Sequence, residues 1–88
     1  MKIKENFVFQ EIAGDYIVVP IANEASQLNG VIKLNETGAF VWKALMLREY
    51  TKEELVNLII EEFHVKAELA EEDIDSFLNT LGRFGCLD

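Results

Sequence analysis

The sequence has few of the residues that form disulfides or hold metals. Its 88 residues include one cysteine, Cys86, and one histidine, His64. An internal disulfide needs two cysteines, and a structural zinc site takes four ligands, drawn mainly from Cys and His. The composition therefore excludes both, and we expect neither a metal nor a cofactor. Cys86 is interpreted as a small packed hydrophobic residue.

Basic residues are scarce as well. The chain has 8 Lys and Arg against 16 Asp and Glu, a formal net charge of −8. Residues 1–50 carry six acids and five bases, whereas residues 51–88 carry ten acids and three bases. Nucleic-acid binding depends on phosphate neutralisation by Lys and Arg, so this balance argues against it. The acidic second half is either a solubilising surface or a surface that attracts a basic partner.

Long apolar runs are missing too. No run approaches the roughly 20 residues that cross a membrane, and none follows the basic start Met1-Lys2-Ile3-Lys4 as a signal peptide would. We expect a cytoplasmic protein without membrane contact. Half of the chain (50%) is nevertheless hydrophobic, which suffices for one core at this length. The sequence predicts a single domain over residues 1–88.

Aromatic and β-branched residues cluster in three short segments, which predicts strands over residues 7–12, 16–19 and 31–34. Gly14-Asp15 is a hairpin turn signal between the first two segments, and Asn29-Gly30 is a turn signal before the third. Consecutive strands with short connections usually pair. We therefore expect a three-stranded antiparallel sheet with its third strand at an edge.

Two helices are predicted after the strands. Asn35 is a good N-cap for a helix over about residues 36–49. Apolar residues surround most of this helix, which predicts a central, buried position. Residues 51–54, Thr-Lys-Glu-Glu, form a capping box that starts the second helix.

A third helix is expected over about residues 70–84, with Glu71, Glu72 and Asp73 in its first turn and Gly85 after its end. The fold class is therefore α+β, with the order βββααα, and is similar to a winged helix-turn-helix.

In a DNA-binding winged helix, the third helix would enter the major groove with basic and amide side chains. Residues 68–75 hold five acids and no base. Repulsion from the phosphates would oppose entry.

No pattern in the sequence predicts catalysis. His64 lies at the expected end of the second helix, where a surface or capping role fits it, and no nucleophile stands beside it. The carboxylates of residues 71–75 lack the alternating ligands and central glycine of a calcium loop. Gly30 and Gly38 stand alone rather than in a phosphate-binding pattern. We expect no enzymatic activity.

Two segments carry a resemblance to a known family. Residues 32–42, Ile-Lys-Leu-Asn-Glu-Thr-Gly-Ala-Phe-Val-Trp, contain a Leu-Asn pair, a Thr-Gly pair and an aliphatic-Trp pair. This segment resembles the hallmark of the PqqD-like family. The residues that resemble that family's third helix and its glycine-apolar ending are Asp73-Ile74-Asp75-Ser76-Phe77-Leu78, Leu81 and Gly85-Cys86-Leu87. The resemblance covers about residues 7–87 and departs at residues 46–50, where many relatives have an Asp-Gly turn.

The resemblance implies a winged-helix-like domain that binds the leader of a ribosomally made precursor peptide. Such domains deliver the peptide to a maturation enzyme, often a radical S-adenosylmethionine (radical SAM) protein, as in pyrroloquinoline quinone (PQQ) biosynthesis. Relatives serve many other modified peptides, so the product stays open. The alternative is a winged-helix regulatory or protein-interaction module, including one that binds DNA. Pairing or swapping into a homodimer stays open too.

An exposed strand can add an extended peptide through its free N–H and C=O groups. We expect the peptide to pair with the third strand, at Val31, Ile32, Lys33 and Leu34. The adjoining groove is expected along one flank of the third helix, at Asp75, Leu78, Asn79 and Gly82. There Gly82 would allow close approach and Asp75 would pair with a basic leader residue. The alternative for these residues is a capped sheet edge and an ordinary amphipathic helix.

Overall fold

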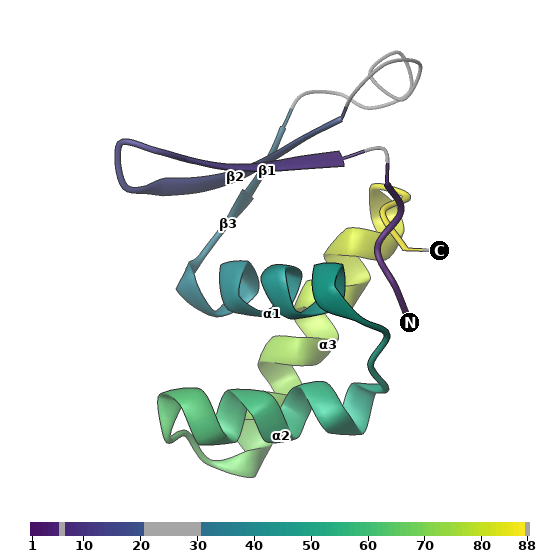
Figure 1. Cartoon of the computed structure of the whole chain (residues 1–88). Coiled ribbons are helices and arrows are strands. Elements are labelled where there is room, and N and C mark those ends of the chain that lie inside the picture. Colours follow the sequence, from purple (N-terminus) through teal and green to yellow (C-terminus); the bar gives the residue numbers. More distant parts are fainter. Residues whose placement is uncertain (6, 21–30, 88) are drawn as a thin grey trace.

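The strands come first along the chain and the helices follow, in a computed structural model that describes residues 1–5, 7–20 and 31–87. The elements are β1 (Phe7–Ile12), β2 (Asp15–Pro20), β3 (Ile32–Leu34), α1 (Glu36–Leu47), α2 (Lys52–Phe63) and α3 (Ala67–Arg83). This order confirms the α+β prediction. Figure 1 shows the sheet above α1, with α2 below α1 and α3 crossing behind both. The winged-helix description fits only loosely, because the sheet covers α1 rather than flanking α2 and α3.

The hairpin turn lies one residue earlier than predicted. Asp15 already pairs with the last residue of β1, so the turn residues are Ala13 and Gly14, with φ of 52° and 85°. The predicted turn at Gly14-Asp15 is therefore wrong by one residue. The observed register places Val18, which is fully buried, in the middle of the sheet. The free energy gained by burying Val18 outweighs the roughly 1–2 kcal/mol that a left-handed backbone costs at Ala13.

β3 joins the other side of β2 and completes an antiparallel sheet with the strand order β1-β2-β3. The strand begins at Ile32, one residue later than predicted, and Val31 before it is exposed. The side chains of Ile32 and Leu34 are buried toward the helices, whereas Lys33 is exposed on the opposite face. The predicted turn at Asn29-Gly30 lies outside the described residues.

α1 begins where the sequence predicts and ends two residues early. The side-chain oxygen of Asn35 accepts a hydrogen bond of 2.7 Å from a backbone N–H of the first turn, which confirms the cap. The helix ends at Leu47 because the backbone of Arg48 is extended. The chain then continues to Tyr50, whose carbonyl accepts a hydrogen bond of 2.8 Å from the N-terminal ammonium. Met46 and Leu47 are exposed, so this end of α1 is not buried as predicted.

α2 starts with the predicted capping box, in which Thr51 and Glu54 each accept the other's backbone N–H. His64 follows α2 as an exposed C-cap in the left-handed conformation, with φ 54°. The chain reverses there within three residues, so α3 begins at Ala67, three residues earlier than predicted. The acids of residues 71–73 consequently lie in the second turn of α3 rather than the first.

The end of α3 has the hydrogen bonds of a Schellman motif, with Gly85 at φ 70°. The N–H of Cys86 donates to the carbonyl of Leu81 at 2.9 Å. Cys86 is buried, and burial raises the pKa of its thiol to about 11, which agrees with a packed hydrophobic role. Its carbonyl accepts from the N–H of Lys4 at 2.8 Å, so the first residues of the chain lie beside the last ones.

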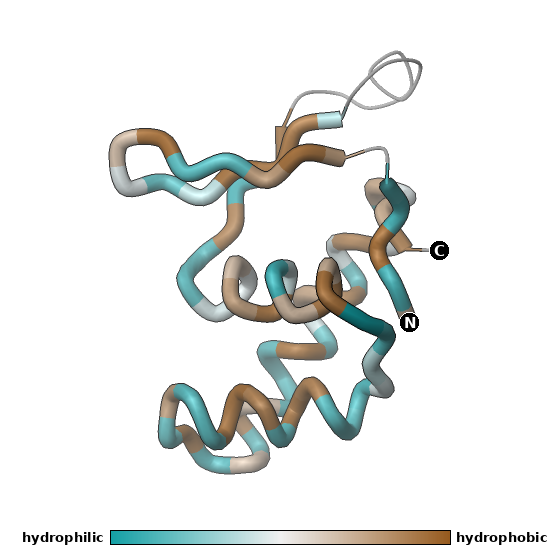
Figure 2. The backbone as a smooth tube through the Cα atoms, in the orientation of Figure 1, coloured by the Kyte–Doolittle hydropathy of each residue, from teal (hydrophilic) through white to brown (hydrophobic). Residues whose placement is uncertain are grey.

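The core lies between the inner face of the sheet and the helices. Figure 2 shows hydrophobic segments recurring along β1 and β2 and along the turns of the helices. Trp42 is fully buried, in line with the central position predicted for its helix, and contacts Phe7 edge-to-face with ring centroids 6.4 Å apart. None of the described helices is long and apolar enough to cross a membrane.

Candidate functional site

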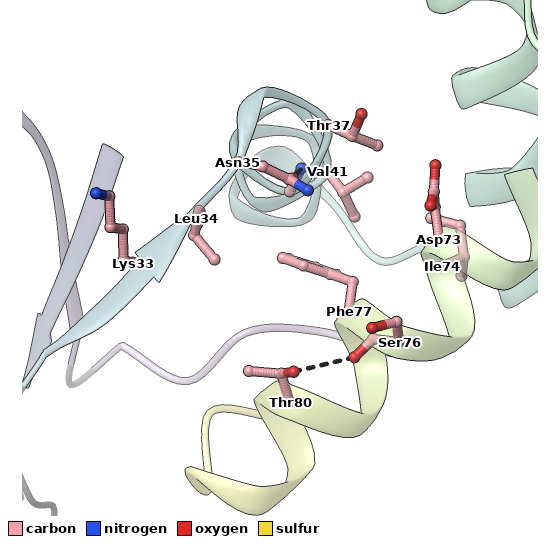
Figure 3. A pocket seen from close by; sticks show the side chains of 11 residues that line it. Lys33, Leu34, Asn35, Thr37, Val41, Asp73, Ile74, Ser76, Phe77 and Thr80 are labelled. Carbon is pink, nitrogen blue, oxygen red and sulfur yellow. Dashed lines mark hydrogen bonds between the residues drawn. The ribbon is translucent and has the colours of Figure 1, made fainter. Parts of the chain in front are cut away.

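A groove runs between β3 and α3, beside the start of α1 (Figure 3). Its volume is about 150 Å³. The residues that line it are Lys33, Leu34, Asn35, Thr37, Gly38, Val41, Asp73, Ile74, Ser76, Phe77 and Thr80. Because Asn35 caps α1 directly after β3, the edge of the sheet and the first turn of a helix belong to the same groove.

One edge of β3 has no strand partner in the described part of the chain, because β2 occupies the other edge. Residues of an antiparallel strand bond alternately to its two sides. The two-residue turn places Asp15 of β2 in a hydrogen-bonded pair with Ile12 of β1. Because the bonding alternates along β2, the residues that bond to β3 are Tyr16 and Val18. They face the last and first residues of β3. The middle residue, Lys33, therefore directs its backbone N–H and C=O away from the sheet, beside the groove.

Apolar side chains form the floor of the groove and polar groups form its rim. The floor consists of the buried residues Leu34, Val41, Ile74 and Phe77. The rim carries the polar side chains of Asn35, Thr37, Asp73, Ser76 and Thr80. The hydroxyl of Thr80 already donates to the carbonyl of Ser76 at 3.0 Å. The groove thus combines an apolar floor with a rim of hydrogen-bond acceptors and hydroxyl groups.

Gly38 sets how closely α1 approaches α3. A Cβ built at this position would lie 3.1 Å from the side-chain oxygen of Asn35 and 3.3 Å from the ring of Phe77. Both distances are shorter than ordinary van der Waals contacts. The absence of a side chain therefore lets the Phe77 ring lie against the first turn of α1, which determines the depth of the groove.

Asp73 and Lys33 stand at opposite ends of the groove in Figure 3. The Lys33 ammonium lies 3.4 Å from the carboxylate of Asp15, in an exposed pair. Asp73 has no salt-bridge partner within residues 1–5, 7–20 and 31–87. The end of the groove near Thr37 therefore presents a carboxylate that can attract a basic group of a ligand.

The structure separates the residues predicted for the site. Lys33 and Leu34 line the groove, whereas Ile32 is buried in the core and Val31 precedes the strand. The groove lining does not include Asp75, Leu78, Asn79 or Gly82.

Asp75 is engaged elsewhere. Its carboxylate lies 2.6 Å from the ammonium of Lys52, the first residue of α2, and this hydrogen bond raises the pKa of Lys52. The predicted flank of α3 therefore faces the start of α2 at Asp75, whereas the groove lies along the opposite flank.

The flank that lines the groove carries Asp73, Ser76, Phe77 and Thr80, spaced at i, i+3, i+4 and i+7 on one side of the helix. The apolar stripe of α3 consists of Ala70, Ile74, Phe77 and Leu81. It has polar residues on both sides, so the stripe alone does not identify the side that faces β3. The sequence does contain one signal. A glycine in the first turn of a helix, Gly38, marks a place where another element approaches closely.

The groove can hold a ligand, but it does not contain a nucleophile beside a base. No histidine or cysteine lines it. Across the described part of the chain, no three His, Cys, Asp or Glu side chains are grouped so as to hold a metal ion. The groove can bind a ligand through backbone hydrogen bonds, apolar contacts and the attraction of a cation.

A comparison with protein families matches residues 15–87 to Coenzyme PQQ synthesis protein D (PqqD). The chain belongs to the PqqD family. The match begins at β2 and includes every residue that lines the groove. It confirms the resemblance carried by residues 32–42 and 73–87.

A comparison with solved structures shows that this PqqD-family chain shares its fold with TbiB1, determined in complex with the TbiA(beta) leader peptide. The TM-score is 0.76 at 24% sequence identity, and the alignment covers 100% of this chain and 95% of that one. No curated protein matches the chain in a sequence comparison.

Proposed function

We propose that this protein is a non-catalytic carrier that binds the leader of a ribosomally made precursor peptide and presents the peptide to a modifying enzyme. The observation that carries the proposal is the open edge of β3 at Lys33, which adjoins the groove against α3. Membership of the PqqD family supports it, as does the fold shared with TbiB1, a protein solved with a leader peptide bound.

The leader adds as a fourth strand beside β3. The N–H and C=O of Lys33 supply main-chain hydrogen bonds, and alternate side chains of the leader point toward Leu34 and Phe77. The groove volume of about 150 Å³ is below the roughly 300 Å³ at which small-molecule pockets begin. Its size therefore suits single apolar side chains better than a whole cofactor.

Asp73 takes the role that the sequence suggested for Asp75, and pairs with a basic residue of the leader. Backbone hydrogen bonds contribute roughly 1 kcal/mol net each. The two bonds of Lys33 therefore supply only about 2 kcal/mol, and the apolar anchors and the charge pair supply the remainder of about −8 kcal/mol, a micromolar Kd, after the cost of association is met. Such an affinity suits a carrier that must release its cargo.

The enzyme partner in this proposal is a radical SAM protein, and the cargo is the precursor of PQQ or of another modified peptide. Carrier, precursor and enzyme meet in the cytoplasm, where the precursor is made. The groove is formed within one chain, so capture of the leader needs no second copy.

Titration of isotope-labelled protein with the short peptide encoded nearest to its gene tests the proposal. We expect amide shifts concentrated at residues 31–34 and at the groove side of α3, residues 73–80. Duplex DNA serves as the comparison. Shifts of the same amides by DNA, and none by the peptide at several hundred micromolar, would favour the regulatory alternative.

Substitution of Lys33 separates backbone pairing from side-chain effects. Lys33→Pro removes the outward N–H without removing a bond to β2, and we expect at least a tenfold loss of leader affinity, because the ring also obstructs the edge. Lys33→Ala keeps the N–H and is expected to bind within about twofold of the parent. Calorimetric titration measures both. A folded Lys33→Pro variant with an unchanged Kd would exclude strand addition at this residue.

A further inference from the structure

A second hollow lies on the other side of α1 from the groove. Its volume is about 180 Å³. The hairpin, α1 and the end of α2 supply its lining residues, Tyr16, Glu36, Ala39, Phe40, Lys43, Glu62 and Phe63. In Figure 1 the hairpin turn, the start of α1 and the end of α2 all lie on the left-hand side of the molecule. We refer to this site as the aromatic hollow.

Four half-buried aromatic rings gather at the aromatic hollow. Phe9 and Tyr16 stack with ring centroids 6.0 Å apart, and Phe40 meets Phe63 edge-to-face at 5.5 Å. The ammonium of Lys43 lies over the first pair, 5.3 Å and 5.9 Å from the two ring centroids. Aromatic side chains are enriched at protein interfaces and account for much of their binding energy. The composition of the aromatic hollow is therefore that of a contact surface.

The charge of the aromatic hollow is unbalanced. Glu36 and Glu62 line it, and neither has a salt-bridge partner in the described residues. The last turn of α2 contains no basic residue, so the negative end of its dipole adds to the charge of Glu62. Glu36 lies in the first turn of α1, where the positive end of that dipole offsets part of its charge, so the excess negative charge is centred on Glu62. Lys43 is the one cation in the lining, and it is held over the rings of the hairpin. The side formed by the helices can therefore take one more cation.

We propose that the aromatic hollow binds an arginine side chain of the enzyme that receives the leader, an inference that rests on the function proposed above. A guanidinium stacks on aromatic faces, donates hydrogen bonds to carboxylates in pairs and sheds water more readily than an ammonium. The faces come from Phe40 and Phe63, and the acceptors are Glu36 and Glu62. Because α1 separates the aromatic hollow from the groove, the enzyme docks beside the leader and does not cover it.

A pair of small probes tests the preference for arginine. Isotope-labelled protein is titrated with the capped tripeptide Gly-Arg-Gly, and with the same tripeptide carrying citrulline, which keeps the shape of arginine but not its charge. We expect the arginine probe to shift the amides of Glu36, Phe40 and Phe63. The citrulline probe should shift them several-fold less.

Glu61 and Glu62 give a matched pair of variants on the same exposed turn of α2. Glu62→Gln should weaken binding of the arginine probe by about fivefold to tenfold, the effect of removing one charge-assisted acceptor. Glu61→Gln removes the same charge outside the aromatic hollow and should leave the Kd within about twofold, because exposed charges are screened by salt.

Equal shifts by both tripeptides, or equal losses in both variants, would overturn the arginine site. Amide shifts confined to the acidic residues 68–75 would also overturn the arginine site, since the probe would then be attracted by net charge alone. The leader titration separates this inference from the proposed function. If the leader binds at Lys33 and the arginine probe does not bind, only this inference falls. If the arginine probe binds and the leader does not, the proposed function falls, and the assignment of the arginine to the enzyme that receives the leader falls with it.

Discussion

Gly38 and Gly82 are both helical glycines, but a methyl group would meet neighbouring atoms at only one of them. A Cβ at Gly38 lies 3.3 Å from the Phe77 ring, whereas a Cβ at Gly82 has nothing within 4 Å. The same substitution at the two positions therefore distinguishes a glycine that shapes the groove from one that does not.

Gly82→Ala is expected to stabilise the protein by about 0.5–1 kcal/mol, because alanine favours the helix and meets no obstacle. Gly38→Ala should lose this gain, since the new methyl group displaces the Asn35 cap and the Phe77 ring. It should also weaken leader binding several-fold, whereas Gly82→Ala should leave binding unchanged. Urea denaturation and calorimetric titration measure the two effects. Equal stabilisation by both variants would show that Gly38 does not fix the depth of the groove.

Asp73 and Asp75 form a second matched pair on α3. Asp73→Asn should reduce affinity for a leader with a basic residue by roughly threefold to tenfold at low salt, and less at high salt. Asp75→Asn breaks only the exposed pair with Lys52 and should leave stability and binding nearly unchanged. Titration at two salt concentrations measures this difference. A greater loss from Asp75→Asn would restore the flank that the sequence suggested.

At the scale of elements, the sequence predicted best the helices whose starts are marked by side chains. Asn35 and the Thr51–Glu54 box begin α1 and α2 as expected. The cap of α3, Lys66, makes no side-chain hydrogen bond, and the start of this helix depends on the left-handed backbone of His64. No glycine, the residue that marks this conformation most clearly, stands at this position, so the sequence alone places the start of α3 about one turn late.

The groove, too, is predictable only where the sequence carries a local signal. The free edge of β3 follows from the strand order, which the sequence indicates. That Lys33 is the residue directed outward depends on the turn at Ala13 and Gly14, one residue from its predicted position. The flank of α3 follows from how α3 crosses α1, and that crossing depends on the contact of Phe77 with Gly38. The apolar stripe of α3 is compatible with either flank, so only the packing of the two helices brings Asp73 rather than Asp75 to the groove.

The segment after α3 is held by the first residues of the chain, through the Ile3–Leu87 bridge and the bond from Lys4 to Cys86. The pKa of the buried Cys86 thiol is raised from 9.0 to about 11 by burial. Stability from the neutral thiol is therefore present below pH 9.0 and is lost as the pH rises through about 11.

We expect iodoacetamide at pH 8.5 to alkylate native Cys86 on the order of 100-fold more slowly than the denatured chain, because fewer thiolates are present. Mass spectrometry over time measures both rates. Similar rates would mean that the C-terminal segment opens readily, and would contradict its attachment to the first residues.

At the scale of the whole molecule, α1 stands between the two surfaces that are proposed to bind partners. The groove lies on one side of this helix and the aromatic hollow on the other, about 10 Å away, the diameter of a helix with its side chains. A leader paired with β3 would thus lie one helix away from the docked enzyme. The formal net charge of −8 favours encounter with a basic partner surface.

The brevity of β3 has a consequence for the protein in a crowded cell. Open strand edges act as templates for aggregation. β3 has three residues, and of these only Lys33 turns its backbone outward. A foreign strand would gain about 2 kcal/mol from such a contact, less than the roughly 4–15 kcal/mol that association costs. Only a chain whose side chains also fit the groove would remain bound, so the edge can stay open without nucleating fibres.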